Sequence, residues 1–155
     1  MKERIIGSIL LENMHKVWLD TNILVDYLVR RKPFETFAID FFKCIEEKEI
    51  NAFTSIVNLI HAHYQLRKTA DDLTARKMIE LISKIITFPE IPSAFHEKAI
   101  ANIEVKDFED AVQYELALLS QSNFLITRNQ KDFPQSESII ICDAETYLKI
   151  HRLKE

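Results

Sequence analysis

The sequence predicts an α/β fold, a three-layer α/β/α sandwich around a mostly parallel sheet of four to five strands. Four short apolar runs suit strands that are covered on both faces, and they lie at 16–19, 50–53, 123–127 and 138–142. Stretches with apolar residues at helical spacing lie between these runs. This alternation of strand and helix patterns is typical of a sandwich with helices on both faces of the sheet.

The predicted helices can be justified from their apolar stripes. Helices are expected over 34–45, 71–85 and 107–120, directly after Asp20, and over the segment that contains His61. The three longest of these place their apolar side chains on one face: Phe34, Phe37, Ala38, Phe41, Phe42 and Ile45 in the first, Leu73, Met78, Ile79, Leu81, Ile82 and Ile85 in the second, and Phe108, Val112, Leu116 and Leu119 in the third.

Length and composition indicate one globular domain. The chain has 155 residues, of which 47% are hydrophobic, and this is enough for a core. We expect the domain to span 15–155. Residues 1–14 form an N-terminal extension, which is either a natural helix or the product of a misplaced start, because Met14 directly precedes the first predicted strand. The longest apolar runs are too short to cross a bilayer or to form a signal-peptide core, so a cytoplasmic protein is expected.

Charge and residue usage exclude several function classes. The net charge of -4 argues against a chain that is basic throughout, although a local basic rim could still bind nucleic acid. A single glycine, Gly7, excludes phosphate-binding loops, dinucleotide fingerprints and glycine-flanked serine elbows, since each needs several glycines. Cys44 and Cys142 have no partner at metal-ligand spacing in the sequence, so we expect buried free thiols.

Polar side chains follow three of the four predicted strands. Asp20 ends the first, Thr54 and Ser55 follow the second, and Thr127, Arg128 and Asn129 come after the apolar residues "NFLI" of the third. In parallel sheets, ligand sites form at the carboxyl ends of the strands. The sequence therefore predicts a site where these polar side chains converge.

Two aspartates at the start of the 107–120 helix add carboxylates to this site. Asp107 and Asp110 are three residues apart, which predicts that they lie side by side, whereas Glu109 is expected to point elsewhere. Asp107 could also be the N-cap of the helix. Several carboxylates in one cleft favour a hard divalent cation, Mg²⁺ or Mn²⁺. A second charged pair, Asp26 with Arg30, has the spacing of an ordinary surface pair on a helix.

Four segments together resemble the PIN-domain family, the ribonuclease fold used by VapC-type toxins. They are "VWLDTNILVDYL", "TSIVNLIHAHYQLRK", "DFEDAVQYELAL" and "FLITRNQKDF", in family order and at family-like spacing, so that the resemblance covers residues 16 to about 150. The resemblance implies a metal-dependent endoribonuclease that hydrolyses RNA phosphodiester bonds through a metal-activated water. It also implies RNA as substrate, an antitoxin protein as a possible partner, and a homodimer.

The resemblance assigns roles to individual residues. Asp20 and Asp110 match the first and third family acids and would be metal ligands and catalytic residues, with Asp107 as a third ligand or base. The second and fourth acid positions fall on His61 and Asn129. Residues that would orient ligands or contact substrate are Thr21, Asn22, Ser55, His61, Thr127, Arg128, Asn129 and Asp132.

Loss of two carboxylates keeps an alternative open. The chain could be a catalytically weakened or inactive PIN-like module that binds RNA or a partner protein. A phosphatase with Asp20 as nucleophile is disfavoured, because such enzymes need a second aspartate where Asn22 is found.

Overall fold

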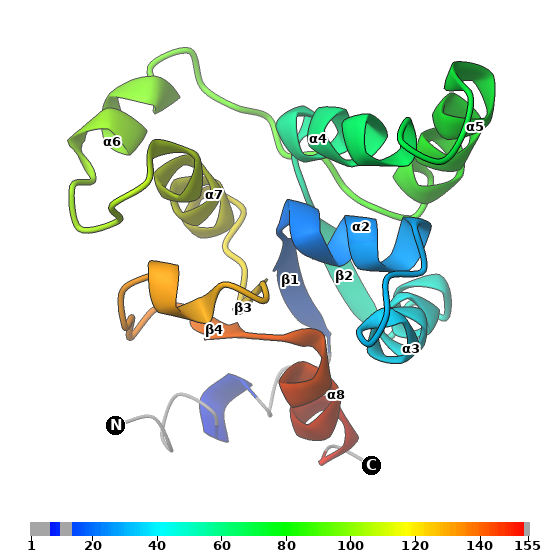
Figure 1. The fold of residues 1–155 in the computed structure, drawn as a ribbon. Coiled ribbons are helices and arrows are strands. Elements are labelled where there is room, and N and C mark those ends of the chain that lie inside the picture. The colour runs from blue at the N-terminus through cyan, green and yellow to red at the C-terminus, as the bar shows by residue number, and fades with distance from the viewer. Residues whose placement is uncertain (1–6, 10–13, 154–155) are drawn as a thin grey trace.

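A parallel four-stranded sheet forms the centre of the computed structural model, which describes residues 7–9 and 14–153 (Figure 1). The strand order is β2-β1-β3-β4, and all three neighbouring pairs are parallel. The predicted α/β fold is therefore confirmed, with four strands. Their bounds are β1 His15–Leu19, β2 Ile50–Phe53, β3 Phe124–Ile126 and β4 Ile140–Cys142.

Helices connect the strands and cover both faces of the sheet (Figure 1). Each predicted helix is present, within a few residues of its expected ends. Two helices were not predicted: α6 is only seven residues long and buries only Ala99, and α8 buries only a narrow stripe. The bounds are α2 Thr21–Leu28, α3 Glu35–Glu46, α4 Ile56–Leu66, α5 Asp72–Ser83, α6 Phe95–Ala101, α7 Phe108–Leu119, the 3₁₀-helix η1 Gln130–Asp132, and α8 Ala144–Arg152.

The two faces of the sheet bury different sets of side chains, because successive residues of a strand point to opposite faces. Leu19 of β1 and Phe124 of β3 belong to the larger core, which also contains buried residues of α2, α3, α4, α5 and α8. Trp18 and Leu125 face the other way and pack with Leu116 and other residues of α7 and the loop before β4. The sheet therefore lies between two helical layers, as predicted.

The predicted N-terminal extension is described only in part, since residues 1–6 and 10–13 lie outside the described residues. Ile9 is buried and belongs to the larger core, and its carbonyl oxygen lies 3.2 Å from His15 Nε2 at the start of β1. The boundary between extension and domain stays a prediction. Among the described residues, none of the helices has the length and apolar character needed to cross a membrane.

Candidate active site

The carboxyl ends of the neighbouring strands β2, β1 and β3 meet at one edge of the sheet. Leu19 of β1 is in register with Ile126 of β3, so the residues that follow these strands are neighbours. The backbone N–H of Asp20 donates to the Ile126 carbonyl oxygen at 3.1 Å, and the Thr54 hydroxyl donates to the Leu19 carbonyl oxygen at 2.9 Å. The parallel register thus brings together the polar groups that are far apart in the sequence.

Asp20 is a buried carboxylate held by three hydrogen bonds. One oxygen accepts from the Thr21 backbone N–H at 2.6 Å, which makes Asp20 the N-cap of α2. The other oxygen accepts from Asn22 Nδ2 at 2.8 Å and from Thr127 Oγ1 at 2.7 Å. Burial raises the pKa of Asp20, and the hydrogen bonds from Thr127 and Thr21 oppose that increase. The carboxylate therefore has a fixed orientation beneath the site.

Asn22 and Thr127 also hold the loop after β3. Asn22 Oδ1 accepts from the Arg128 backbone N–H at 3.1 Å, and Thr127 Oγ1 accepts from the Asn129 backbone N–H at 3.0 Å. The Asn129 side chain is exposed and lines a pocket with Phe34 and Arg128, apart from the acidic groove described below. Asn22 and Thr127 are thus the predicted ligand-orienting or substrate residues whose side chains hydrogen-bond to the Asp20 carboxylate.

The first turn of α7 supplies the second group of carboxylates. Asp107 is the N-cap of α7, and its Oδ1 accepts from the backbone N–H groups of Glu109 and Asp110 at 2.9 and 3.2 Å. Partial burial raises the pKa of Asp110 to about 6, and the charges of Asp20, Asp107, Asp132 and Glu109 add to this increase. The pKa of Asp110 is thus raised both by burial and by four neighbouring carboxylates.

An open groove of about 440 Å³ gives access to these carboxylates. Asp107, Asp110 and Asp132 line it together with the basic residues Lys106 and Lys131. A groove lined by both carboxylates and lysines can bind a divalent cation and the phosphate groups of a substrate at once.

Glu109 corrects one prediction, because it does not point away from the site. Its carboxylate lies 2.9 Å from His61 Nδ1, and its charge raises the pKa of both Asp20 and Asp110. Asp107, as N-cap, has a non-helical backbone, so the spacing rule for helix faces does not apply across it. His61, at the position of a family acid, therefore has an acidic neighbour from α7.

Arg128 and Asp26 correct a second prediction, that Asp26 pairs with Arg30 at the surface. Asp26 is buried, and its Oδ2 lies 2.9 Å from Arg128 Nε. The guanidinium of Arg128 also lies over the ring of Phe34, 4.4 Å from its centroid. The Arg128 side chain is therefore already engaged with a carboxylate and an aromatic ring.

A buried polar network beneath the site was missed by the sequence reasoning. Asn58 of α4 donates to the Leu19 carbonyl oxygen at 2.9 Å, to Thr54 Oγ1 at 3.0 Å and to Gln113 Oε1 at 2.8 Å. Its own Oδ1 accepts from Gln113 Nε2 and from Thr21 Oγ1. The sequence did contain a signal for this network: Asn58 and Gln113 are amide residues among the apolar residues of α4 and α7. Such buried polar side chains need hydrogen-bond partners.

Two further members complete this network. Trp18 Nε1 donates to Gln113 Oε1 at 2.8 Å, which links the sheet to α7. Ser55, predicted as a site residue, is buried and is the N-cap of α4, accepting from the Asn58 backbone N–H at 3.3 Å. The network therefore joins β1 and the loop after β2 to α2, α4 and α7. Asp20 directly precedes α2, and Asp107 and Asp110 lie at the start of α7.

The carboxylates in and near the groove suit a hard divalent cation. Asp107, Asp110 and Asp132 line the groove, and Asp20 is near enough for its charge to act on Asp110. All four offer oxygen donors, which Mg²⁺ and Mn²⁺ prefer. The pKa of Asp110 is raised first by partial burial and then by repulsion from the neighbouring carboxylates, and a bound cation would relieve that repulsion. Within the described ranges, no three of the carboxylates converge within 4.8 Å of one another. The residues fit such an ion, provided that their side chains turn inward around it.

Replacing Asp110 by asparagine is expected to stabilise the metal-free protein. The folded-state pKa of about 6 exceeds the usual value of 3.8, so above pH 6 the ionised carboxyl is less favourable in the folded than in the unfolded chain. Its contribution to stability therefore falls as pH rises from about 4 to 6 and stays low above that range. In chelator at pH 7.5, Asp110→Asn should melt a few degrees higher than the unsubstituted protein, and at pH 4 this difference should vanish.

Thermal unfolding followed by circular dichroism checks this expectation. Glu90→Gln, an exposed acid-to-amide change in a loop, is the matched control and should leave the melting temperature unchanged at both pH values. A lower melting temperature for Asp110→Asn at pH 7.5 would mean that the carboxylate is not repelled by its neighbours.

The sequence and the fold of the chain are both similar to those of known proteins. The family model of the PIN domain matches residues 16–131. Ribonuclease VapC1 of Aquifex aeolicus (strain VF5) is 28% identical over 128 residues, which span 78% of this chain and 85% of that protein. The crystal structure of Mycobacterium tuberculosis VapC20, described as a sarcin-ricin loop cleaving toxin, superposes with a TM-score of 0.59 at 12% identity. That match covers 75% of this chain and 92% of VapC20.

Proposed function

The chain belongs to the PIN domain family, and from this premise we propose that it is a metal-dependent endoribonuclease that hydrolyses RNA phosphodiester bonds. One observation carries the proposal: the carboxylates of Asp107, Asp110 and Asp132 line one groove, and Asp20 and Glu109 are near enough for their charges, added to the effect of partial burial, to raise the pKa of Asp110 to about 6. Like charges placed this close together destabilise the folded protein, and such groups are commonly found at functional sites. The relationship to Ribonuclease VapC1 supports the same reaction class.

Asp20 and Asp110 would hold the cation, Mg²⁺ or Mn²⁺, with Asp107 as third ligand. A bound divalent ion would supply an activated water and neutralise charge that develops on the phosphate. Asp107 accepts both capping hydrogen bonds with Oδ1, so its Oδ2 is left for this role. Asp132 adds a further carboxylate to the lining of the groove.

The remaining residues orient these ligands and the substrate. Asn22 and Thr127 donate to one oxygen of Asp20 and so fix the direction of its carboxylate. Lys106 and Lys131 line the groove and would contact the RNA backbone, which positions the substrate without reading its sequence. Since Arg128 is engaged with Asp26 and Phe34, we assign it to holding the loop after β3 in place.

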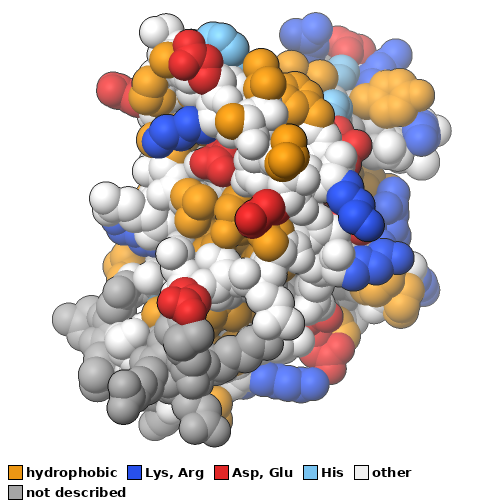
Figure 2. Space-filling model, turned by 90° about the vertical axis from the view of Figure 1, so that its left-hand side faces the viewer, with side chains coloured by type: hydrophobic (Ala, Val, Ile, Leu, Met, Phe, Trp, Pro, Cys, Tyr) orange, Lys and Arg blue, Asp and Glu red, His pale blue; other side chains and the backbone are white. Residues whose placement is uncertain are grey.

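The proposal includes partners of the kind that toxin-like PIN proteins have. We propose RNA as substrate, an antitoxin protein as a possible regulator, a homodimer as the assembly, and the cytoplasm as the location. Figure 2 views the side of the molecule on which α6 lies, and hydrophobic side chains gather over the upper and central part of this face. Large apolar residues of α6, the following loop and α7 are exposed, among them Ile100, Ile103 and Phe108. Such a surface supports a protein interface.

Metal-dependent cleavage of RNA tests the proposed activity. Purified protein should cleave a mixed-sequence oligoribonucleotide with Mn²⁺ or Mg²⁺, and EDTA should abolish the cleavage because the carboxylates alone activate no water. The products, resolved on a denaturing gel, should form a limited set of internal fragments. Cleavage that ignores EDTA would contradict the proposed mechanism.

A module without catalysis is the second candidate, and the pairing of His61 with Glu109 favours it. In that case the protein would bind the same oligoribonucleotide without cutting it, and calorimetry would detect no binding of Mg²⁺ or Mn²⁺ at millimolar concentration. The double substitution His61→Glu with Asn129→Asp should then create cation binding, since it restores both family acids. In the ribonuclease, by contrast, calorimetry on the unsubstituted protein already detects the cation.

A further inference from the structure

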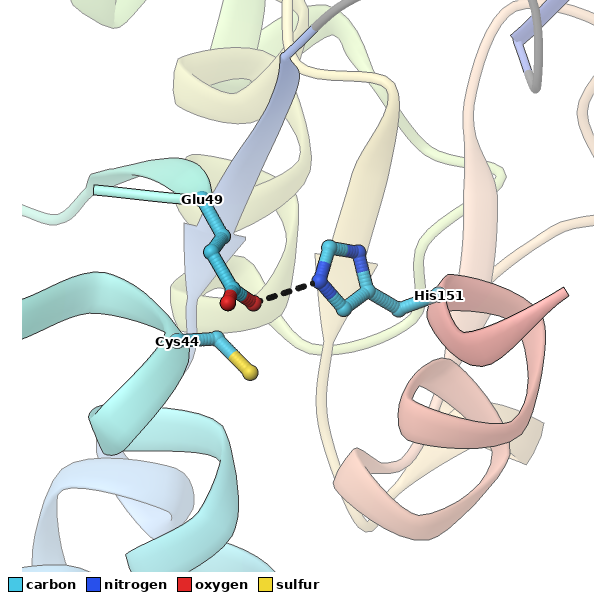
Figure 3. A group of neighbouring side chains, drawn as sticks. All are labelled: Cys44, Glu49 and His151. Carbon is cyan, nitrogen blue, oxygen red and sulfur yellow. Dashed lines mark hydrogen bonds and ion pairs between the residues drawn. The ribbon is translucent and has the colours of Figure 1, made fainter. Parts of the chain in front are cut away.

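A second group of metal-ligating side chains lies at the other end of the sheet (Figure 3). It consists of Cys44 in α3, Glu49 directly before β2, and His151 in α8. One donor atom from each residue lies within 4.8 Å of the other two. Because β2 begins at Ile50, the group is at the amino ends of the strands, whereas the acidic groove lies at their carboxyl ends. The two groups are therefore separate sites.

The three side chains are oriented toward one another. His151 Nε2 lies 2.8 Å from Glu49 Oε2, and Figure 3 shows the Cys44 sulfur directed into the space beside them. His151 Nδ1 is buried and has no hydrogen-bond partner among the residues that the structure describes, whereas Nε2 is the ring nitrogen that faces Glu49. A surface depression of about 210 Å³ is lined by all three residues and opens them to solvent.

The donor types differ from those of the acidic groove. A thiolate, an imidazole and a carboxylate are the ligands that Zn²⁺ takes in proteins, and thiolate disfavours Mg²⁺ and Mn²⁺. Bond lengths to zinc place the donors of a tetrahedral site about 3.5 Å apart. The His151–Glu49 contact would open slightly and the sulfur would move inward, which are changes within the reach of side-chain rotation.

The charges around Cys44 also suit a cation. Burial raises the pKa of the Cys44 thiol to about 11, and the carboxylates of Glu49, Glu47 and Asp40 add to that increase. The same carboxylates attract a dication, which would displace the thiol proton on binding. Lys43 and Arg152 also line the depression, but each lies within 4.0 Å of one of these outer carboxylates, Glu47 and Asp40 respectively.

We propose that Cys44, Glu49 and His151 form a zinc-binding site with a fourth position open to water. The ligands come from α3, the turn before β2, and α8, so a bound ion would join the last described helix to the body of the domain. Since the unfolded chain does not hold the three donors together, zinc should stabilise the folded state.

Cobalt binding followed by absorption spectroscopy tests the site, because a Co²⁺–thiolate bond gives a charge-transfer band that oxygen ligands do not give. Reduced protein without an affinity tag, freed of metal with chelator, should show this band on addition of Co²⁺. One equivalent of Zn²⁺ should remove it. Zn²⁺ alone should raise the melting temperature by a few degrees in the unsubstituted protein and leave that of Cys44→Ser unchanged.

Variants separate this site from the rest of the molecule. Cys44→Ser should lose the band, and Glu49→Gln, which can keep the hydrogen bond to His151, should weaken cobalt binding at least about tenfold. Cys142→Ala, at the buried second cysteine, and Asp20→Asn, in the acidic groove, should keep the band. Absence of the band in the reduced unsubstituted protein, its persistence in Cys44→Ser, or unchanged affinity in Glu49→Gln would overturn the proposal.

Discussion

Asp20→Asn is expected to reduce RNA cleavage at least about 100-fold while leaving the protein folded. The substitution removes the charge of the carboxylate that the geometry places under the site. It also replaces one carboxylate oxygen with an NH₂ group. If the NH₂ takes the place of Oδ2, it faces the donors Asn22 Nδ2 and Thr127 Oγ1, and if it takes the place of Oδ1, it faces the Thr21 backbone N–H. In both orientations donor faces donor, so the side chain cannot keep the orientation of a metal ligand.

Initial rates of oligoribonucleotide cleavage with saturating Mn²⁺ measure this effect. Glu90→Gln is again the matched control, because it makes the same chemical change on an exposed loop and should cleave at the unsubstituted rate. Circular dichroism of both variants verifies folding. If Asp20→Asn retained more than about a tenth of the rate, the observed cleavage would not depend on this carboxylate, and a contaminating nuclease would be the first explanation to test.

Asn58→Ala is expected to lower the free energy of unfolding by about 3 kcal/mol. The side chain of Asn58 is fully buried and makes hydrogen bonds to Leu19, Thr54, Gln113 and Thr21. Alanine leaves several of these buried groups without a partner, and each such group costs about 1–3 kcal/mol. Because Thr21 follows Asp20 directly and Gln113 lies one turn after Asp110, cleavage should fall as well, even under conditions in which the variant is folded.

Urea unfolding curves give the stability change. Asn51→Ala is the matched control: Asn51 is a half-buried residue of β2 whose side chain makes one long hydrogen bond, 3.4 Å, with Thr87. We expect its cost to be below about 1 kcal/mol. If the two substitutions lowered the free energy of unfolding by the same amount, the hydrogen bonds of Asn58 would contribute no more to stability than the side chain of Asn51.

The fold was predictable because it depends on patterns that are local in the sequence. Continuous apolar runs such as 138–142 identify strands covered on both faces, and the stripe over 34–45 identifies the helix between β1 and β2. Helices α6 and α8 escaped prediction because both are short, seven and nine residues, and each buries few side chains, so neither has the long apolar stripe that marks the predicted helices.

The candidate site was predictable to the extent that it follows from strand ends. Asp20 and Thr127 lie at the carboxyl ends of neighbouring parallel strands, and this alone implies that they meet. The position of Asp110 follows from its place in the first turn of α7. The roles of these residues in metal binding stay predictions, which the substitutions above test.

Other features depended on which distant side chains come into reach, and only the tertiary structure decided them. Glu109 contacts His61 because α7 begins beside α4, and Arg128 pairs with Asp26 rather than leaving it to Arg30, because the loop after β3 passes over α2. The same holds for the group of Cys44, Glu49 and His151, whose members come from three elements. A sequence pattern gives the direction of a side chain relative to its own helix or strand. Its hydrogen-bond and ionic partners depend on the packing of elements that can be more than a hundred residues apart, and no local period records that packing.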